Sequence, residues 1–252
     1  MDQIYIPKNR MGFEIGQQVF ILPIQNPLQI QESPQKKPIF YNLDKIEPIK
    51  LEIINKIFDL ISKINPENII ITGSFLEKGF NFNDIDILII KEEKINKEPI
   101  EERIISLTGI KPHIIVLSMK TLSIGLNTDP LYNLMLSKYI SQKRIILKTK
   151  REINYKLLDL NLLKSKTLID NFDILNGNEK YYLVLNMLSI LMFIQNKKIT
   201  KDIVNKEIEK FFDIKIEELK ENLIEKNKFI KKYRETYDKT FELIMKKIKP
   251  SD

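Results

Sequence analysis

The sequence predicts an α+β protein, in which a small β-sheet flanked by helices is followed by an all-α domain. Short apolar runs rich in β-branched residues alternate with helical periodicity in the first part of the chain, and only helical periodicity follows. The length of 252 residues is enough for one large domain or two smaller ones. We therefore expect an N-terminal extension at residues 1–42, an α+β domain at 43–150 and a helical domain at 151–252.

Composition excludes two classes of protein. A hydrophobic share of 43% is too high for a disordered chain, and 30% charged residues argue against a membrane bundle. No apolar run reaches the roughly 20 residues that span a bilayer, and no charged-then-apolar leader opens the chain, so we expect no membrane segment and a cytoplasmic location. The absence of cysteine excludes disulfides and thiolate metal sites.

The net charge of +7 favours a polyanionic partner. Sequences rich in lysine and isoleucine can also be basic for compositional reasons alone. The charge therefore gives only a weak preference for RNA.

The N-terminal extension contains several prolines, which break any long helix. Its segment 13–22, FEIGQQVFIL, predicts one or two short strands, and the PQKKP stretch at 34–38 predicts a loop. No chemistry is assigned to this section.

A helix and two strands form the centre of the predicted sheet domain. Apolar residues at spacings of three and four predict an amphipathic helix over 43–64, with Pro48 in its first turn and Asn65-Pro66 at its end. Two β-branched runs, 69–72 and 85–90, then predict short strands.

Four further elements complete the predicted sheet domain. We expect a helix over 100–107 that ends at Gly109, and a strand over 113–117 that lies beside the 85–90 strand. A short helix over 131–140 and a last strand over 145–147 follow.

The remainder of the chain is predicted to be helical. Apolar periodicity indicates helices over 154–175 and 203–212 and one long helix within 216–248. The segment 181–194 is apolar nearly all the way round, which predicts the central helix of a bundle.

Candidate chemistry lies between the two central strands. Asp84 and Asp86 stand two residues apart at the start of a strand, so both carboxylates share one face. Two such charges repel each other unless a cation lies between them, and Mg²⁺ is typically held by one or two carboxylates plus substrate phosphates. The preceding Gly73-Ser74 turn offers backbone N–H groups and a hydroxyl to a phosphate. These residues together predict a site for a metal and a nucleoside triphosphate.

This stretch resembles the nucleotidyltransferases related to DNA polymerase β, in the runs GSFLEKG and NDIDILII. The resemblance covers about residues 43–150 and implies a small mixed β-sheet core. It also implies that Gly73 and Ser74 hold the β and γ phosphates and that Asp84 and Asp86 bind Mg²⁺ or Mn²⁺. The implied substrate is a nucleoside triphosphate, for which we expect ATP, and many members append a helical domain that positions the acceptor.

One position departs from the family pattern. Members carry a third carboxylate on the neighbouring strand, where it helps to bind the catalytic metal and to activate the attacking hydroxyl. Here His113, the single histidine of the chain, takes that place. Three accounts stay open: His113 substitutes as the general base, another acid such as Asp129 moves in, or the active site is weakened.

The expected reaction is an in-line attack of an acceptor hydroxyl on the α-phosphorus of the triphosphate. Lys78, in the loop between the two strands, is a candidate to assist it, and Lys143, Arg144 and Lys148 flank the predicted last strand. A solvated loop lysine is the commoner role for each lysine. The acceptor could be RNA, a protein or a small molecule. The competing class is a regulatory protein that binds nucleotide or nucleic acid on the same scaffold without catalysis.

Overall fold

The computed structural model describes residues 37–146 and 150–248, with side chains as far as residue 246. The strands expected within 13–22 lie outside this range, as do Leu147 and Lys148.

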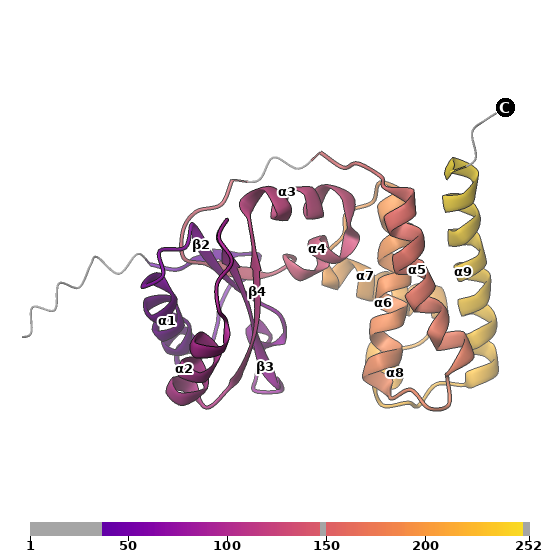
Figure 1. Ribbon diagram of the computed structural model, residues 1–252. Helices are drawn as coiled ribbons and strands as arrows, with labels where there is room; N and C mark the ends of the chain where they lie inside the picture. Colours follow the sequence, from indigo (N-terminus) through magenta and orange to yellow (C-terminus); the bar gives the residue numbers. More distant parts are fainter. Residues whose placement is uncertain (1–36, 147–149, 249–252) are drawn as a thin grey trace, which may run out of the picture. The chain divides into compact units, whose positions relative to one another are not determined.

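A mixed five-stranded sheet forms the first half of the described chain (Figure 1). Its strand order is β1-β5-β2-β3-β4. Neighbouring strands are antiparallel except for β3 and β4, which are parallel. The strands are β1 (Ile39–Tyr41), β2 (Asn68–Thr72), β3 (Asp84–Ile90), β4 (Lys111–Leu117) and β5 (Tyr139–Ser141). The α+β class and the mixed sheet are thereby confirmed.

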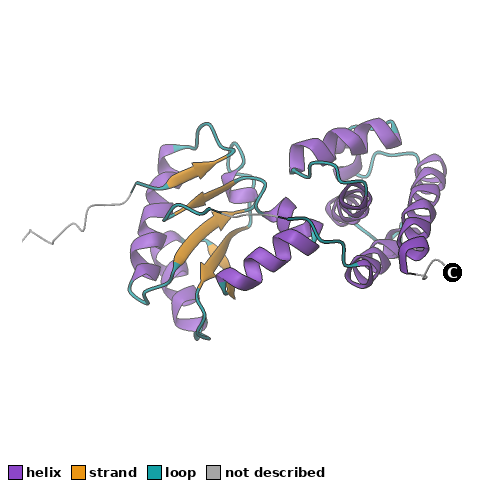
Figure 2. Cartoon of the chain, turned by 90° about the horizontal axis from the view of Figure 1, so that it is seen from above, coloured by secondary structure: helices purple, strands orange, loops and turns teal. Residues whose placement is uncertain are grey.

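Residues of α1 and α2 form one core with the sheet strands, so these helices cover one face of the sheet, a face on which helices are seen in Figure 2. Helix α1 (Pro48–Ser62) precedes β2, and Pro48 begins its first turn, where a missing N–H costs nothing. Helix α2 (Glu98–Thr108) is the crossover that a parallel β3–β4 pair requires. It ends at Gly109, which adopts the left-handed conformation with φ +70° as a C-cap. The predicted C-cap at this glycine is confirmed.

The other face of the sheet packs against two shorter helices, α3 (Met119–Thr128) and α4 (Pro130–Met135). Every residue of β2 is buried, because Ile69 and Ile71 face the core beneath α1 and α2 while Ile70 faces the core beneath α3 and α4. This double burial explains why the strand is a continuous apolar run.

The region between residues 131 and 147 differs from the prediction. The helix expected to reach Ile140 ends at Met135, and Tyr139–Ser141 form strand β5, which pairs with both β1 and β2. Ile145 and Ile146 are not part of a strand. The physical reason is that Ile140 pairs opposite Ile71 and is fully buried between the two neighbouring strands. Burial within the sheet therefore overrides the helical spacing of the sequence.

Five helices form the second half of the described chain. Helix α6 lies at their centre, since it packs against each of the other four and is buried along most of its length, as predicted. The helices are α5 (Tyr155–Asp170), α6 (Gly177–Ile194), α7 (Lys201–Phe212), α8 (Ile216–Lys220) and α9 (Lys226–Ile248).

The prediction of a single long helix within 216–248 is wrong. This segment is divided into α8 and α9 at Asn222, whose φ of +59° places it in the left-handed region that ends a helix. Helix α5 is also shorter than expected, since it ends at Asp170. Its start is as predicted, with the Asn154 side chain accepting a hydrogen bond from the Leu157 N–H at 3.1 Å.

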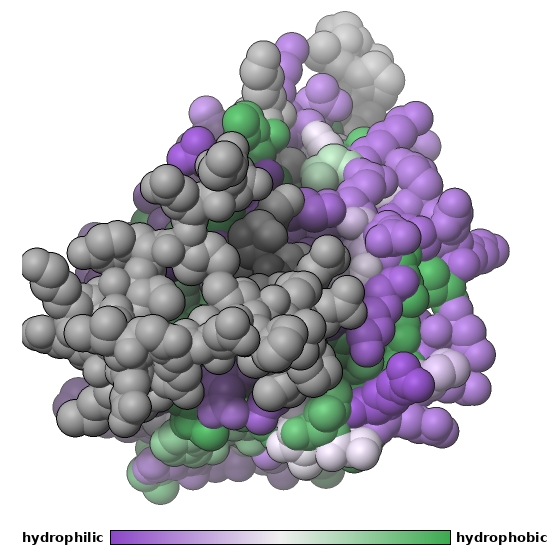
Figure 3. Space-filling model, turned by 90° about the vertical axis from the view of Figure 1, so that its left-hand side faces the viewer, coloured by the Kyte–Doolittle hydropathy of each residue, from purple (hydrophilic) through white to green (hydrophobic). Residues whose placement is uncertain are grey.

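None of the described helices combines the length and apolar character that crossing a membrane would require. Figure 3 shows one face of the molecule, on which hydrophilic residues cover much of the part formed by described residues, with smaller apolar areas between them.

Candidate active site

Asp84 and Asp86 lie at the start of β3 on the same face of the strand. Both are half-buried, whereas Ile85 and Ile87 between and after them are fully buried on the opposite face. The side chain of Asp86 is 31% exposed. The two carboxylates therefore reach solvent from the edge of an otherwise apolar strand, as the period of two predicts.

The strand register brings two other site residues beside Asp86. Thr72, the last residue of β2, pairs with Asp86 on one side, and His113 of β4 pairs with it on the other. Gly73 directly follows Thr72. The glycine turn and the histidine thus flank the same carboxylate from the two neighbouring strands.

Gly73 is restricted to glycine for two reasons. Its φ of +83° lies in a region that side chains rarely adopt. A Cβ atom built at this position would also overlap the Asp86 carboxylate oxygen Oδ2. The backbone of the turn therefore lies directly against the carboxylate, at a distance that only glycine allows.

Ser74 begins a short 3₁₀ turn, Ser74–Leu76, that continues from Gly73. Ser74 is half-buried, while Phe75 and Leu76 are buried in the core beneath α1 and α2. The apolar pair anchors the turn in the core, and Ser74 remains partly exposed.

His113 contacts Asp86 directly. Its ring nitrogen Nδ1 lies 2.9 Å from Asp86 Oδ1, and its side chain is 61% exposed. An ionised carboxylate only accepts hydrogen bonds, so the contact assigns the proton of a neutral ring to Nδ1. In that tautomer Nε2 carries a free lone pair, which is the form required of a general base.

Asp129 has a different role in the fold. Its Oδ1 accepts the Leu131 N–H at 2.9 Å, which caps the N-terminus of α4. The described residues also contain no group of three histidine, aspartate or glutamate side chains arranged to hold a metal. The geometry therefore associates His113, rather than Asp129, with the aspartate pair.

A divalent cation fits the donor set formed by Asp84 and Asp86. Mg²⁺ is commonly bound by one or two carboxylates while substrate phosphates and waters complete its coordination. The Asp86 carboxylate fills the place that a side chain at position 73 would take, so the turn backbone lies directly beside it. Backbone N–H groups of such a turn are suited to a phosphate.

The predicted basic residues differ in their surroundings. Lys78 is exposed in the loop after the turn. Lys143 instead donates from Nζ to the backbone carbonyls of Pro66 at 3.0 Å and Glu67 at 2.8 Å, so it stabilises the connection between α1 and β2. Arg144 is exposed.

Two lysines near the turn were not predicted. Lys138 lies beside the end of β2, where its carbonyl accepts the Thr72 hydroxyl at 3.1 Å. Lys201, at the start of α7, pairs with Glu77 at 3.2 Å, and Lys138 lies 3.8 Å from the same carboxylate. Lys138 also pairs with Asp202 at 3.1 Å. These residues come from separate elements, so no local sequence pattern connects them.

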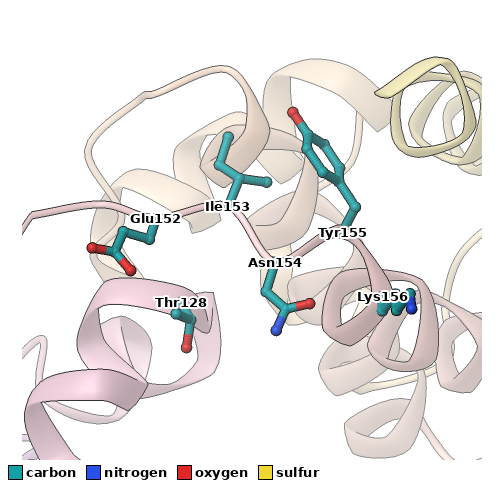
Figure 4. A pocket seen from close by; sticks show the side chains of 6 residues that line it. All are labelled: Thr128, Glu152, Ile153, Asn154, Tyr155 and Lys156. Carbon is teal, nitrogen blue, oxygen red and sulfur yellow. The ribbon is translucent and has the colours of Figure 1, made fainter. Parts of the chain in front are cut away.

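A separate hollow of about 480 Å³ contains none of the candidate site residues (Figure 4). It lies where the end of α3 meets the segment leading into α5. Asn154, one of its polar residues, is used as the N-cap of α5. Its lining residues are Thr128, Glu152, Ile153, Asn154, Tyr155 and Lys156.

Comparison with known proteins identifies no family for this chain. Neither a protein-family model nor a curated protein matches the sequence.

Proposed function

We propose that this chain is a metal-dependent nucleotidyltransferase that transfers a nucleoside monophosphate from a triphosphate to an acceptor hydroxyl. One observation carries the proposal: the Gly73 turn lies so close to the Asp86 carboxylate that no side chain could intervene. A turn suited to phosphate and a carboxylate suited to a cation are thereby adjacent, as a triphosphate–metal complex requires.

The roles of the residues follow from their positions. Asp84 and Asp86 would hold Mg²⁺ or Mn²⁺, and the turn at Gly73 and Ser74 would bind the β and γ phosphates. When bound, the cation would neutralise charge that develops on the α-phosphate and on the pyrophosphate leaving group. Lys78 is a further candidate for contact with the phosphates.

His113 would accept the proton of the attacking hydroxyl at Nε2. The hydrogen bond from its Nδ1 to Asp86 favours the tautomer in which Nε2 is free. Because the ring is exposed, an acceptor can reach it from solvent. The histidine thus offers the proton transfer for which the family uses a third carboxylate.

The charge of the chain indicates the class of the acceptor. The net charge of +7 favours RNA over a protein or a small molecule. ATP is the expected nucleotide donor, on the family resemblance.

A second candidate function is a non-catalytic protein that binds nucleotide or nucleic acid. The observation that favours it is the presence of His113 at the position of a carboxylate, since histidine is a poorer Mg²⁺ ligand. Such a protein would bind a triphosphate with metal but would transfer nothing.

An incorporation assay with labelled nucleotide tests the two candidates. It uses ATP, CTP, GTP or UTP with Mg²⁺ or Mn²⁺, and total RNA or protein as the acceptor. Label incorporation that is lost in Asp86→Asn and kept in Glu242→Gln, an exposed acid on α9, would support the transferase. Metal-dependent triphosphate binding without incorporation would support the second candidate. Absence of both would exclude the transferase and a nucleotide-binding protein, and a binding assay with labelled RNA then tests the nucleic-acid-binding form of the second candidate.

A further inference from the structure

Lys50 is an unusual residue of helix α1, because its side chain is completely buried. Its Nζ donates a 2.6 Å hydrogen bond to the backbone carbonyl of Glu77. The same nitrogen lies 3.1 Å from Glu47 Oε2. A buried ammonium is stable only with such partners, so its position is fixed by the two acceptors.

Glu47 connects the same ion pair to a second point of the loop. Its other oxygen, Oε1, accepts the Gly79 backbone N–H at 2.8 Å. This N–H is the first of several hydrogen bonds that hold the pKa of Glu47 below its usual value, so the ionised form is favoured. One ion pair therefore binds the backbone on both sides of Lys78.

Aromatic side chains of the loop surround the ammonium of Lys50. The ring centroids of Phe75, Phe80 and Phe82 lie 5.4 to 5.7 Å from Nζ, within the range of a cation–π interaction. All three rings belong to the segment between β2 and β3. The lysine thus contacts this segment through a carbonyl and three rings.

The loop has few other main-chain contacts that could fix its shape. Within the described backbone, the turn is closed by bonds from the Leu76 N–H to the Gly73 carbonyl and from the Glu77 N–H to the Ser74 carbonyl. Among the residues that the structure describes, 78–83 form no further backbone–backbone hydrogen bond of a turn or loop. The contacts from Lys50 and Glu47 therefore hold the part of the loop that follows the turn.

We infer that Lys50, together with Glu47, is a positioning residue for triphosphate binding. It holds the loop from Gly73 to Gly79 in the conformation that presents the turn and Lys78 to the phosphates. This inference rests on the proposed function, since the phosphate site is part of it. A methionine could fill the same apolar space, but it could not bind the Glu77 carbonyl or the Glu47 carboxylate.

The test compares Lys50→Met with Lys56→Met, an exposed lysine on the same helix. Affinity for a non-hydrolysable ATP analogue with Mg²⁺ is measured by calorimetry, and turnover by label incorporation. We expect at least about tenfold weaker binding and a raised KM in Lys50→Met, with kcat within about threefold of the wild-type value. Lys50 contacts no reacting group, so the loss falls on binding. Lys56→Met should match the wild type.

Glu47→Ala provides an independent measurement if Lys50→Met folds poorly. Glu47 is half-buried, and its removal frees the Gly79 N–H. We expect faster hydrogen exchange at the Gly79 amide and a similar loss of triphosphate affinity. A role limited to general stability would lower the melting temperature without separating KM from kcat.

The outcomes separate this inference from the proposed function. Weaker triphosphate binding in either variant, with Lys56→Met unchanged, supports the positioning role. Wild-type affinity in both Lys50→Met and Glu47→Ala overturns it and leaves the proposed function intact. A wild-type protein that shows no metal-dependent triphosphate binding overturns both.

Discussion

Gly73 must be glycine for two structural reasons. The turn needs a positive φ, and the Asp86 carboxylate leaves no room for a Cβ. Gly79, in the same loop, has a similar φ of +78° but open space around it. The two glycines therefore differ in the contact with Asp86 and resemble each other in backbone conformation.

This difference makes a matched pair of variants. Gly73→Ala should bear both the backbone strain and the overlap with Asp86, so we expect it to lose metal-dependent triphosphate binding by about tenfold or more. Gly79→Ala should bear a strain of about 1 kcal/mol alone and keep most of the affinity. Calorimetric titration of both variants measures the contrast. Equal affinities would contradict a phosphate site at the Gly73 turn.

The contact of His113 with Asp86 leads to a separate prediction. Because it accepts a proton and binds no phosphate in the proposed mechanism, His113→Ala should lower kcat by about 10²-fold or more while triphosphate affinity changes little. Single-turnover label incorporation and calorimetry measure the two quantities. His113→Asp, which places at this position the carboxylate carried by the nucleotidyltransferases that the sequence resembles, should recover part of the rate. Unchanged turnover in His113→Ala would remove this residue from the mechanism.

At the element scale, the strands and helices with strong local signals were predictable. The β-branched runs at β2 and β3 and the glycine after α2 are such signals, and each is observed within a few residues of its expected place. Strand β5 was missed because its three residues acquire their conformation from pairing with β1 and β2, which lie far away in the sequence. The break between α8 and α9 depends on one asparagine with positive φ, whose signal is weak inside a helical pattern.

The same distinction applies to the candidate site. The shared face of Asp84 and Asp86 follows from the period of a strand, and the neighbourhood of His113 follows from the pairing of adjacent strands. The burial of Lys50 could not be predicted, because a lysine in a helix is ordinarily exposed. Its spacing of three from Glu47 was the one local hint of an ion pair.

At the scale of the whole molecule, both halves of the described chain contain deeply buried tyrosines. Burial raises the pKa of Tyr139, in the sheet, to about 12 and that of Tyr181, in α6, to about 12. Burial also raises the pKa of Tyr233, in α9, whose hydroxyl donates to the Ser165 carbonyl at 2.8 Å. Burial in the folded state therefore favours the neutral phenol of each tyrosine over the charged phenolate.

These shifts predict that the protein unfolds more easily in alkali. A tyrosine with a raised pKa contributes stability that is complete below its unfolded value of about 10 and is lost as the pH rises toward the folded value. Near pH 11 each tyrosine with a folded pKa of about 12 should lower the free energy of unfolding by about 1 kcal/mol.

The variant Tyr233→Phe should have a free energy of unfolding about 1–2 kcal/mol lower at neutral pH, because the Ser165 carbonyl loses its hydrogen-bond donor. Its stability should also depend less on pH than that of the wild type. Urea unfolding near pH 8 and near pH 11 measures both effects, with the exposed Tyr182→Phe as the control that keeps the wild-type dependence. The same pH dependence in Tyr233→Phe and in the wild type would contradict the role of this buried hydroxyl, and the alkaline loss would then have to come from other groups.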